Sequence, residues 1–144
     1  MNTNIFPRMH VSLYVSDMDR TVNFYNKFFG LQPVKIKPGY AKYILEKPSL
    51  IISFVQNEER VNENFGHLGF QVESIEELQS RKAEAESKSI QTLEGKGTNC
   101  CYAIQDKFWV SDPDGVRWEV YYFHADSEFR DIDIKSDEMK ACCA

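Results

Sequence analysis

The sequence predicts an α+β fold built from two βαβββ modules. The chain repeats itself, because the stretch from His10, HVSLYVSDMDRTVNFY, aligns without a gap with the stretch from His67, HLGFQVESIEELQSRK. Each copy opens with the alternation of a half-buried strand and then changes to helical spacing. Three extended apolar runs follow each helix. With 144 residues, of which 42% are hydrophobic, the chain is of single-domain size.

The first module is expected at about residues 9–56. Asp17 is a helix N-cap and Gly30 a left-handed terminator, so the helix lies between them. The extended runs LQPVKI, AKYILE and SLIISFV follow. One apolar stripe on this helix is formed by Met18, Val22, Tyr25 and Phe29.

The second module is expected at about residues 66–124. Its helix begins with the capping box SIEE at Ser74 and fades into ESKSI. The runs IQTLE, CYAIQD with KFWVSD, and VRWEVYYF follow, with the turn DPDG before the last. The apolar pattern stops at Ala125, so we expect one domain at 1–124 and a flexible acidic tail at 125–144.

Charge and hydropathy exclude several classes of partner. The net charge is -5 and lysines and arginines do not cluster, which argues against nucleic acid. The apolar run around residues 50–55 is shorter than the roughly 20 residues of a membrane span. The first ten residues lack the charged and apolar regions of a signal peptide. We therefore expect a cytoplasmic protein with neither a membrane nor a nucleic-acid partner.

Strand alternation places three candidate ligands on faces turned away from the helices. His10 and His67 occupy equivalent positions in the repeat, and Glu119 has the same parity in the last strand. Two histidines and one carboxylate are a typical ligand set of nonheme iron. A single strand histidine or glutamate is more often hydrogen-bonded or solvated, and parity leaves their convergence open. His124 has no counterpart in the repeat and is expected to be non-catalytic.

Four cysteines form two adjacent pairs, Cys100-Cys101 and Cys142-Cys143. Neighbouring α-carbons are about 3.8 Å apart, below the roughly 4.4 to 6.8 Å across a disulfide, so free thiols in a reducing compartment are expected. The first pair follows a glycine-rich turn in GKGTNCCYAIQDKFWV. We interpret this pair as a ligand in a loop.

These motifs resemble the vicinal oxygen chelate superfamily, which contains glyoxalases and extradiol dioxygenases. The resemblance covers about residues 9–124 and is carried by MHVSLYVSDMDRTVNFYNKFFGL, FGHLGFQV and FWVSDPDGVRWEVYYF. It implies a cup-shaped mixed β-sheet with the helices outside, around a metal held by His10, His67 and Glu119. Ser53 stands where glyoxalase I has a fourth protein ligand, which favours members with three.

The segment GTNCCYA is similar to that of the organoarsenical carbon-arsenic lyases and their cadmium-induced relatives. This resemblance implies an Fe(II)-dependent dioxygenase that uses O2 to cleave trivalent organoarsenicals, such as methylarsenite, to arsenite. Cys100 and Cys101 would hold the arsenic, and His10, His67 and Glu119 the iron, which nickel, manganese or zinc can replace. Gly95 and Gly97 would let the cysteine loop swing and close. We hypothesise that three aromatic side chains form an apolar wall around the organic group of the substrate, namely Tyr102, Phe108 and Trp109.

The same residues are compatible with three further functions. The chain could sequester cadmium or arsenite without turnover, or act as a thiol transferase or extradiol dioxygenase with the same metal triad. The thiol pair argues against the last two, because neither reaction needs it. The sequence leaves open methyl or aryl preference, a monomer or a homodimer, and the role of Cys142 and Cys143.

Overall fold

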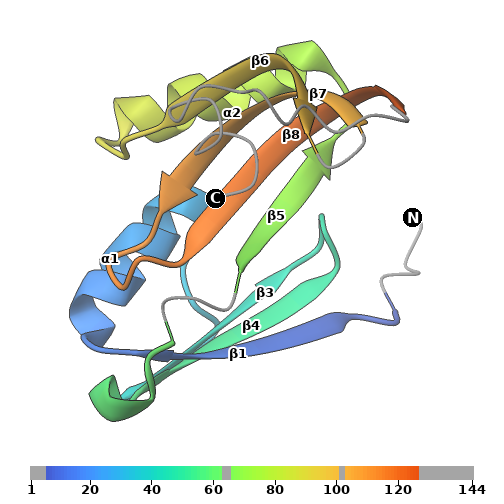
Figure 1. The fold of residues 1–144 in the computed structure, drawn as a ribbon. Helices are drawn as coiled ribbons and strands as arrows, with labels where there is room; N and C mark the ends of the chain where they lie inside the picture. The colour runs from blue at the N-terminus through green and yellow to red at the C-terminus, as the bar shows by residue number, and fades with distance from the viewer. Residues whose placement is uncertain (1–5, 63–65, 101–102, 127–144) are drawn as a thin grey trace. The chain divides into compact units, whose positions relative to one another are not determined.

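The computed structural model describes residues 6–62, 66–100 and 103–126, drawn in colour in Figure 1. The chain divides into two compact units. Unit 1 runs to Asn64 and includes Asp112–Asp114, and unit 2 comprises the rest. Each unit holds one βαβββ module and one four-stranded mixed sheet, so the predicted repeat is confirmed.

Unit 1 contains the strand order β1-β4-β3-β2, in which β1 and β4 are parallel and the other pairs are antiparallel. Helix α1 contacts β3 and β4. A short 3₁₀ turn, η1, follows the last strand. The elements are β1 Met9–Val15, α1 Met18–Phe29, β2 Lys35–Lys37, β3 Tyr40–Leu45, β4 Leu50–Gln56 and η1 Glu58–Arg60.

Helix α1 has the ends that the sequence predicts. The Asp17 carboxylate accepts a 3.0 Å hydrogen bond from the Arg20 N–H, and Gly30 ends the helix at φ 68°. Strand β2 is shorter than the predicted run LQPVKI and begins at Lys35. Pro33 lacks the N–H that a strand ladder needs, which accounts for the late start.

The core of unit 1 is aromatic and lies between α1 and its sheet. The rings of Tyr25 and Phe54 stack with centroids 4.3 Å apart, and Tyr43 meets Phe54 edge-on at 6.0 Å. All three side chains are fully buried. Both tyrosine hydroxyls have hydrogen-bond partners, because Tyr25 donates to Asp112 and Tyr43 is hydrogen-bonded to Asn26.

Unit 2 repeats the arrangement with the strand order β5-β8-β7-β6, in which β5 and β8 are parallel. Figure 1 shows α2 along one face of this sheet. The Ser74 hydroxyl caps α2 by accepting from the Glu77 N–H at 3.1 Å, as the capping box predicts. The elements are β5 His67–Val72, α2 Ile75–Ser87, β6 Leu93–Cys100, β7 Ala103–Ser111 and β8 Arg117–Asp126.

Two boundaries in unit 2 differ from the prediction. Strand β6 continues through Gly95 and Gly97 to Cys100, so the glycines predicted in a swinging loop belong to a strand with a bulge. Strand β8 continues past residue 124, because Asp126 still pairs with Ala103.

The predicted loop position of Cys101 and the flexible tail beyond residue 126 lie outside the described residues. In the described part of the chain, no helix combines the length and the apolar character that crossing a membrane requires.

Candidate metal centre

A cavity of about 290 Å³ lies on the sheet of unit 2. Its walls come from β5, β7 and β8, and the residues that face it alternate along these strands. This alternation confirms the predicted parity of His67 and Glu119. The lining residues are His67, Gly69, Gln105, Lys107, Glu119 and Tyr121.

His67 and Glu119 meet in this cavity from two neighbouring parallel strands. Their Nε2 and Oε2 atoms are 3.5 Å apart. Gly69 lies opposite Glu119 in the ladder, and a Cβ at this position would collide with the Glu119 carbonyl oxygen. The glycine therefore allows β5 to run close to the strand that carries the carboxylate.

Lys107 supplies a positive charge at the base of the cavity. Its Nζ lies 3.7 Å from Glu119 Oε2, and 1% of its side chain is exposed, against 9% for Glu119. Burial raises the pKa of the Glu119 carboxyl, and the charges of Lys107 and His67 act in the opposite direction. The net effect is a raised pKa, so the Glu119 carboxyl is more basic than an exposed glutamate although Lys107 lies beside it.

Trp109 forms the apolar side of His67. The two rings meet edge to face with centroids 4.9 Å apart, and Trp109 is buried. Phe108, the next residue along β7, lines a separate hollow with Leu78 of α2. Of the three aromatic residues in the predicted wall, only Trp109 contacts His67, Phe108 belongs to the helix side of the sheet, and Tyr102 lies outside the described residues.

His10 belongs to unit 1. It projects from β1 on the face predicted for it, and its Nε2 lies 3.4 Å from the Ser53 hydroxyl on β4. His10 is exposed, whereas Ser53 is 4% exposed. The meeting of His10 with His67 and Glu119 remains a prediction.

The donors of unit 2 are compatible with a divalent metal. Imidazole nitrogen and carboxylate oxygen bind such ions at about 2.0 to 2.2 Å, so two donors of one ion are at most roughly 4.4 Å apart. The 3.5 Å between His67 Nε2 and Glu119 Oε2 lies within this limit. Among the described residues of either unit, no three His, Cys, Asp or Glu side chains are grouped to hold a metal. Unit 2 thus offers two donors, and a complete site needs another.

Strand parity places Tyr121 on the same face as Glu119, but the sequence prediction missed two cavity residues, Gln105 and Lys107. Lys107 was hardest to find, since a lysine beside apolar residues usually reaches solvent. The available signal was parity: Lys107 shares a strand face with Gln105 and Trp109 on β7, and β7 pairs with the strand that carries Glu119.

Cys100 is the last residue of β6, and its backbone pairs with Ala103 of β7. Cys101 lies outside the described residues, as do Cys142 and Cys143. The binding of arsenic by Cys100 and Cys101 therefore stays a prediction. His124 contacts Asp106 and Tyr122 and does not line the cavity of His67.

Comparison with known proteins identifies relatives along most of the chain. The model of the Glyoxalase/Bleomycin resistance protein/Dioxygenase superfamily matches residues 9–120. A trivalent organoarsenical cleaving enzyme of Bacillus sp. (strain MD1) is 45% identical over 93% of this chain and 81% of that protein. The cadmium-induced protein CadI of Mycobacterium bovis is 36% identical over 94% of this chain and 92% of that protein.

Solved structures agree on the fold. A glyoxalase/bleomycin resistance protein/dioxygenase from Alicyclobacillus acidocaldarius superposes with a TM-score of 0.69, covering 85% of this chain and 96% of that one. Its sequence identity is 14%, so this likeness concerns the fold alone.

Proposed function

The chain belongs to the Glyoxalase/Bleomycin resistance protein/Dioxygenase superfamily, and we propose that it is an Fe(II)-dependent carbon-arsenic lyase acting on trivalent organoarsenicals. Its relatives named as trivalent organoarsenical cleaving enzymes support the substrate class. The observation that carries the proposal is the contact of His67 with the buried Glu119 carboxylate at 3.5 Å in a chain with such relatives.

His67 and Glu119 would hold the iron, with His10 as the third ligand. A two-histidine, one-carboxylate set leaves coordination positions open, and the bound iron would supply activation of dioxygen. The charge of Lys107 lowers the pKa of the Glu119 carboxyl against the larger raising effect of burial, and so favours the carboxylate form that a metal needs. Trp109 limits access of water to the His67 ring from one side.

Cys100 and Cys101 would bind the arsenic, because soft thiolates favour thiophilic centres. Holding the substrate beside the metal raises the effective concentration of the reacting groups. For methylarsenite, one molecule of substrate and one of dioxygen give one arsenous acid and one formaldehyde. The carbon-arsenic bond breaks, the carbon loses electrons to dioxygen, and arsenic stays trivalent.

A turnover experiment tests this function. The full chain is loaded anaerobically with ferrous iron, given methylarsenite or a trivalent aryl arsenical, and then exposed to oxygen. We expect oxygen uptake and arsenite release beyond one equivalent of protein. Glu119→Gln, which keeps the size of the side chain and removes its charge, should abolish both. Glu76→Gln, the same change at an exposed position on α2, is the matched control and should keep them.

Sequestration is the second candidate, and the similarity to the cadmium-induced protein favours it. In that case the protein would bind one equivalent of arsenical or cadmium and release no arsenite.

Cysteine variants distinguish the lyase from a thiol transferase and from an extradiol dioxygenase. Cys100→Ser and Cys101→Ser should remove arsenical turnover, whereas either of those two enzymes would keep its activity without these thiols.

A further inference from the structure

Strand β6 carries a one-residue bulge immediately before the cysteine pair. Gly95 pairs with Lys107, but Thr98 pairs with Gln105, so two residues of β6 stand against the single residue Asp106 of β7. After the bulge the new register continues to Cys100, which pairs with Ala103. The bulge therefore sets the backbone register of β6 against β7 from Thr98 onward.

Asp106 holds the bulge with its side chain. Its Oδ1 accepts a hydrogen bond from the N–H of Gly97, a residue that has no ladder partner in β7. Gly97 has a φ of 54°, a conformation that glycine adopts without strain. The side chain of Asp106 thus replaces the strand hydrogen bond that the bulge removes.

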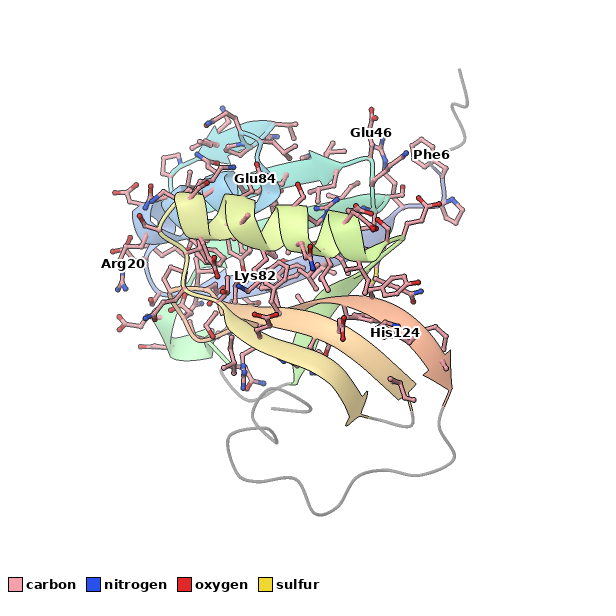
Figure 2. All side chains as sticks on the ribbon, turned by 90° about the horizontal axis from the view of Figure 1, so that it is seen from above. Phe6, Arg20, Glu46, Lys82, Glu84 and His124 are labelled. Atoms are coloured by element: carbon pink, nitrogen blue, oxygen red, sulfur yellow. The ribbon has the colours of Figure 1, made fainter. Side chains whose placement is uncertain are left out.

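The second oxygen of Asp106 faces another irregularity of the same sheet. Its Oδ2 is 3.5 Å from His124 Nε2, and 20% of the Asp106 side chain is exposed. His124 is itself the extra residue of β8, since Ile104 pairs with Ala125 whereas Gln105 pairs with Phe123. Figure 2 labels His124 on this strand. One carboxylate therefore contacts both bulges of the sheet.

Strand β6 is also fixed on the other side of the bulge. Lys82 of α2 lies 3.5 Å from Glu94, two positions before the bulge begins, and 2.8 Å from Glu86 of its own helix. Figure 2 shows Lys82 pointing from α2 toward the sheet. With its start tied to α2, the path of β6 toward Cys100 depends on the geometry of the bulge.

We propose that Asp106 is a positioning residue for the backbone of Cys100: by accepting from the Gly97 N–H it fixes the bulge that sets the register of β6 up to this residue. The inference rests on the proposed function, because it takes Cys100 and Cys101 as the arsenic ligands. A ligand residue that is held in place before binding loses less conformational entropy when it binds, so a loose bulge should weaken arsenic capture.

Arsenical binding by two variants tests this role. Asp106→Ala removes the acceptor, and Asp106→Asn keeps an oxygen at the same place. Binding of phenylarsenite to the full chain is measured anaerobically by calorimetry, with cobalt(II) binding as a second readout. We expect the arsenical affinity of Asp106→Ala to be about tenfold weaker, which is the effect of losing one hydrogen bond to a charged group. Asp106→Asn should restore most of it, and cobalt affinity should stay unchanged.

The controls keep the outcomes separate. Glu76→Ala, an exposed acid on α2, should bind phenylarsenite like the wild type. Wild-type affinity in Asp106→Ala, or equal losses in the alanine and asparagine variants, would overturn the inference. Binding that survives Cys100→Ser instead contradicts the proposed function.

Amide hydrogen exchange tests the Asp106 contact without any ligand. In the wild type we expect the Gly97 amide to be protected and Asp106→Ala to expose it, while β7 stays protected. A Gly97 amide that exchanges freely in the wild type would overturn the inference, whatever happens at the cysteines. This arm also applies if the alanine variant folds poorly.

Discussion

The Lys107 ammonium lies 3.7 Å from the Glu119 carboxylate inside unit 2, with 1% and 9% of the two side chains exposed. A charge at this depth is tolerated because its partner is close, and each member becomes costly when the other is removed. The Lys107 charge thus offsets part of the rise in the pKa of the Glu119 carboxyl that burial causes.

The first prediction concerns this ion pair. Lys107→Met leaves Glu119 without its nearest cation, so we expect the free energy of unfolding of the metal-free protein to fall by roughly 3 kcal/mol. The double variant Lys107→Met with Glu119→Gln should regain part of that loss, because neither of these two positions then carries a buried charge. Denaturant unfolding of the four proteins gives the coupling. Additive effects would mean that the two groups do not interact.

The second prediction concerns the glycine opposite Glu119. A methyl group in Gly69→Ala would meet the Glu119 carbonyl oxygen and lie 3.2 Å from its Cβ, so β5 and β8 must separate. We expect a loss of about 1 to 3 kcal/mol in unfolding free energy and weaker metal binding. Gln71→Ala, at an exposed position on the same strand face, is the control. Wild-type stability and metal affinity in Gly69→Ala would show that β5 and β8 can separate without a cost in free energy, which would contradict this prediction.

The repeated module made most of this fold predictable. The alignment of His10 with His67 revealed the repeat. Strand alternation is a local property, so parity alone placed His67 and Glu119 on the face of the sheet that lines the cavity. Helix ends were equally local, since Asp17, Gly30 and Ser74 cap the helices that they were predicted to cap.

Long-range pairing explains what the sequence did not predict. Gly95 and Gly97 indicate a turn by composition, but they are strand residues because Asp106, on the next strand, satisfies the bulge. Lys107 is buried because Glu119 lies on a neighbouring strand. Such partners are far apart in sequence, and local patterns do not pair them.

The third prediction concerns a buried hydrogen bond in unit 1. The Tyr25 hydroxyl donates at 2.7 Å to Asp112, 87 positions further along the chain. Tyr25→Phe removes the donor and leaves a buried carboxylate with one bond fewer, so we expect a loss of about 1.5 to 3 kcal/mol in unfolding free energy. Tyr14→Phe is the matched control, because its hydroxyl contacts Arg60 at the surface. Equal losses in the two variants would contradict the assignment.

The fourth prediction concerns alkaline pH. Burial raises the pKa of Tyr43 above that of a tyrosine in the unfolded chain. The folded state therefore keeps the neutral phenol while the unfolded state ionises, so stability is lost as pH rises above about 10. Denaturant unfolding at several alkaline pH values should show a shallower loss in Tyr43→Phe than in the wild type. Identical pH dependence would rule out Tyr43 as the cause.

The last prediction concerns the third metal ligand. His67 and Glu119 supply two donors 3.5 Å apart, and His10 is the proposed third ligand. If His10 binds the same ion, His10→Ala should weaken cobalt(II) or iron(II) affinity by more than about tenfold, since even outer contacts of a metal site are worth 10- to 100-fold.

Two variants serve as controls for this measurement. Ser53→Ala removes only the hydroxyl that lies 3.4 Å from His10 Nε2, and it should change the affinity little, because a serine hydroxyl is a weak ligand for these ions. His124→Ala tests whether the loss of any histidine has the same effect. Should His10→Ala bind metal like His124→Ala, the ion would be held by unit 2 alone, and the duplicated histidine would need another explanation.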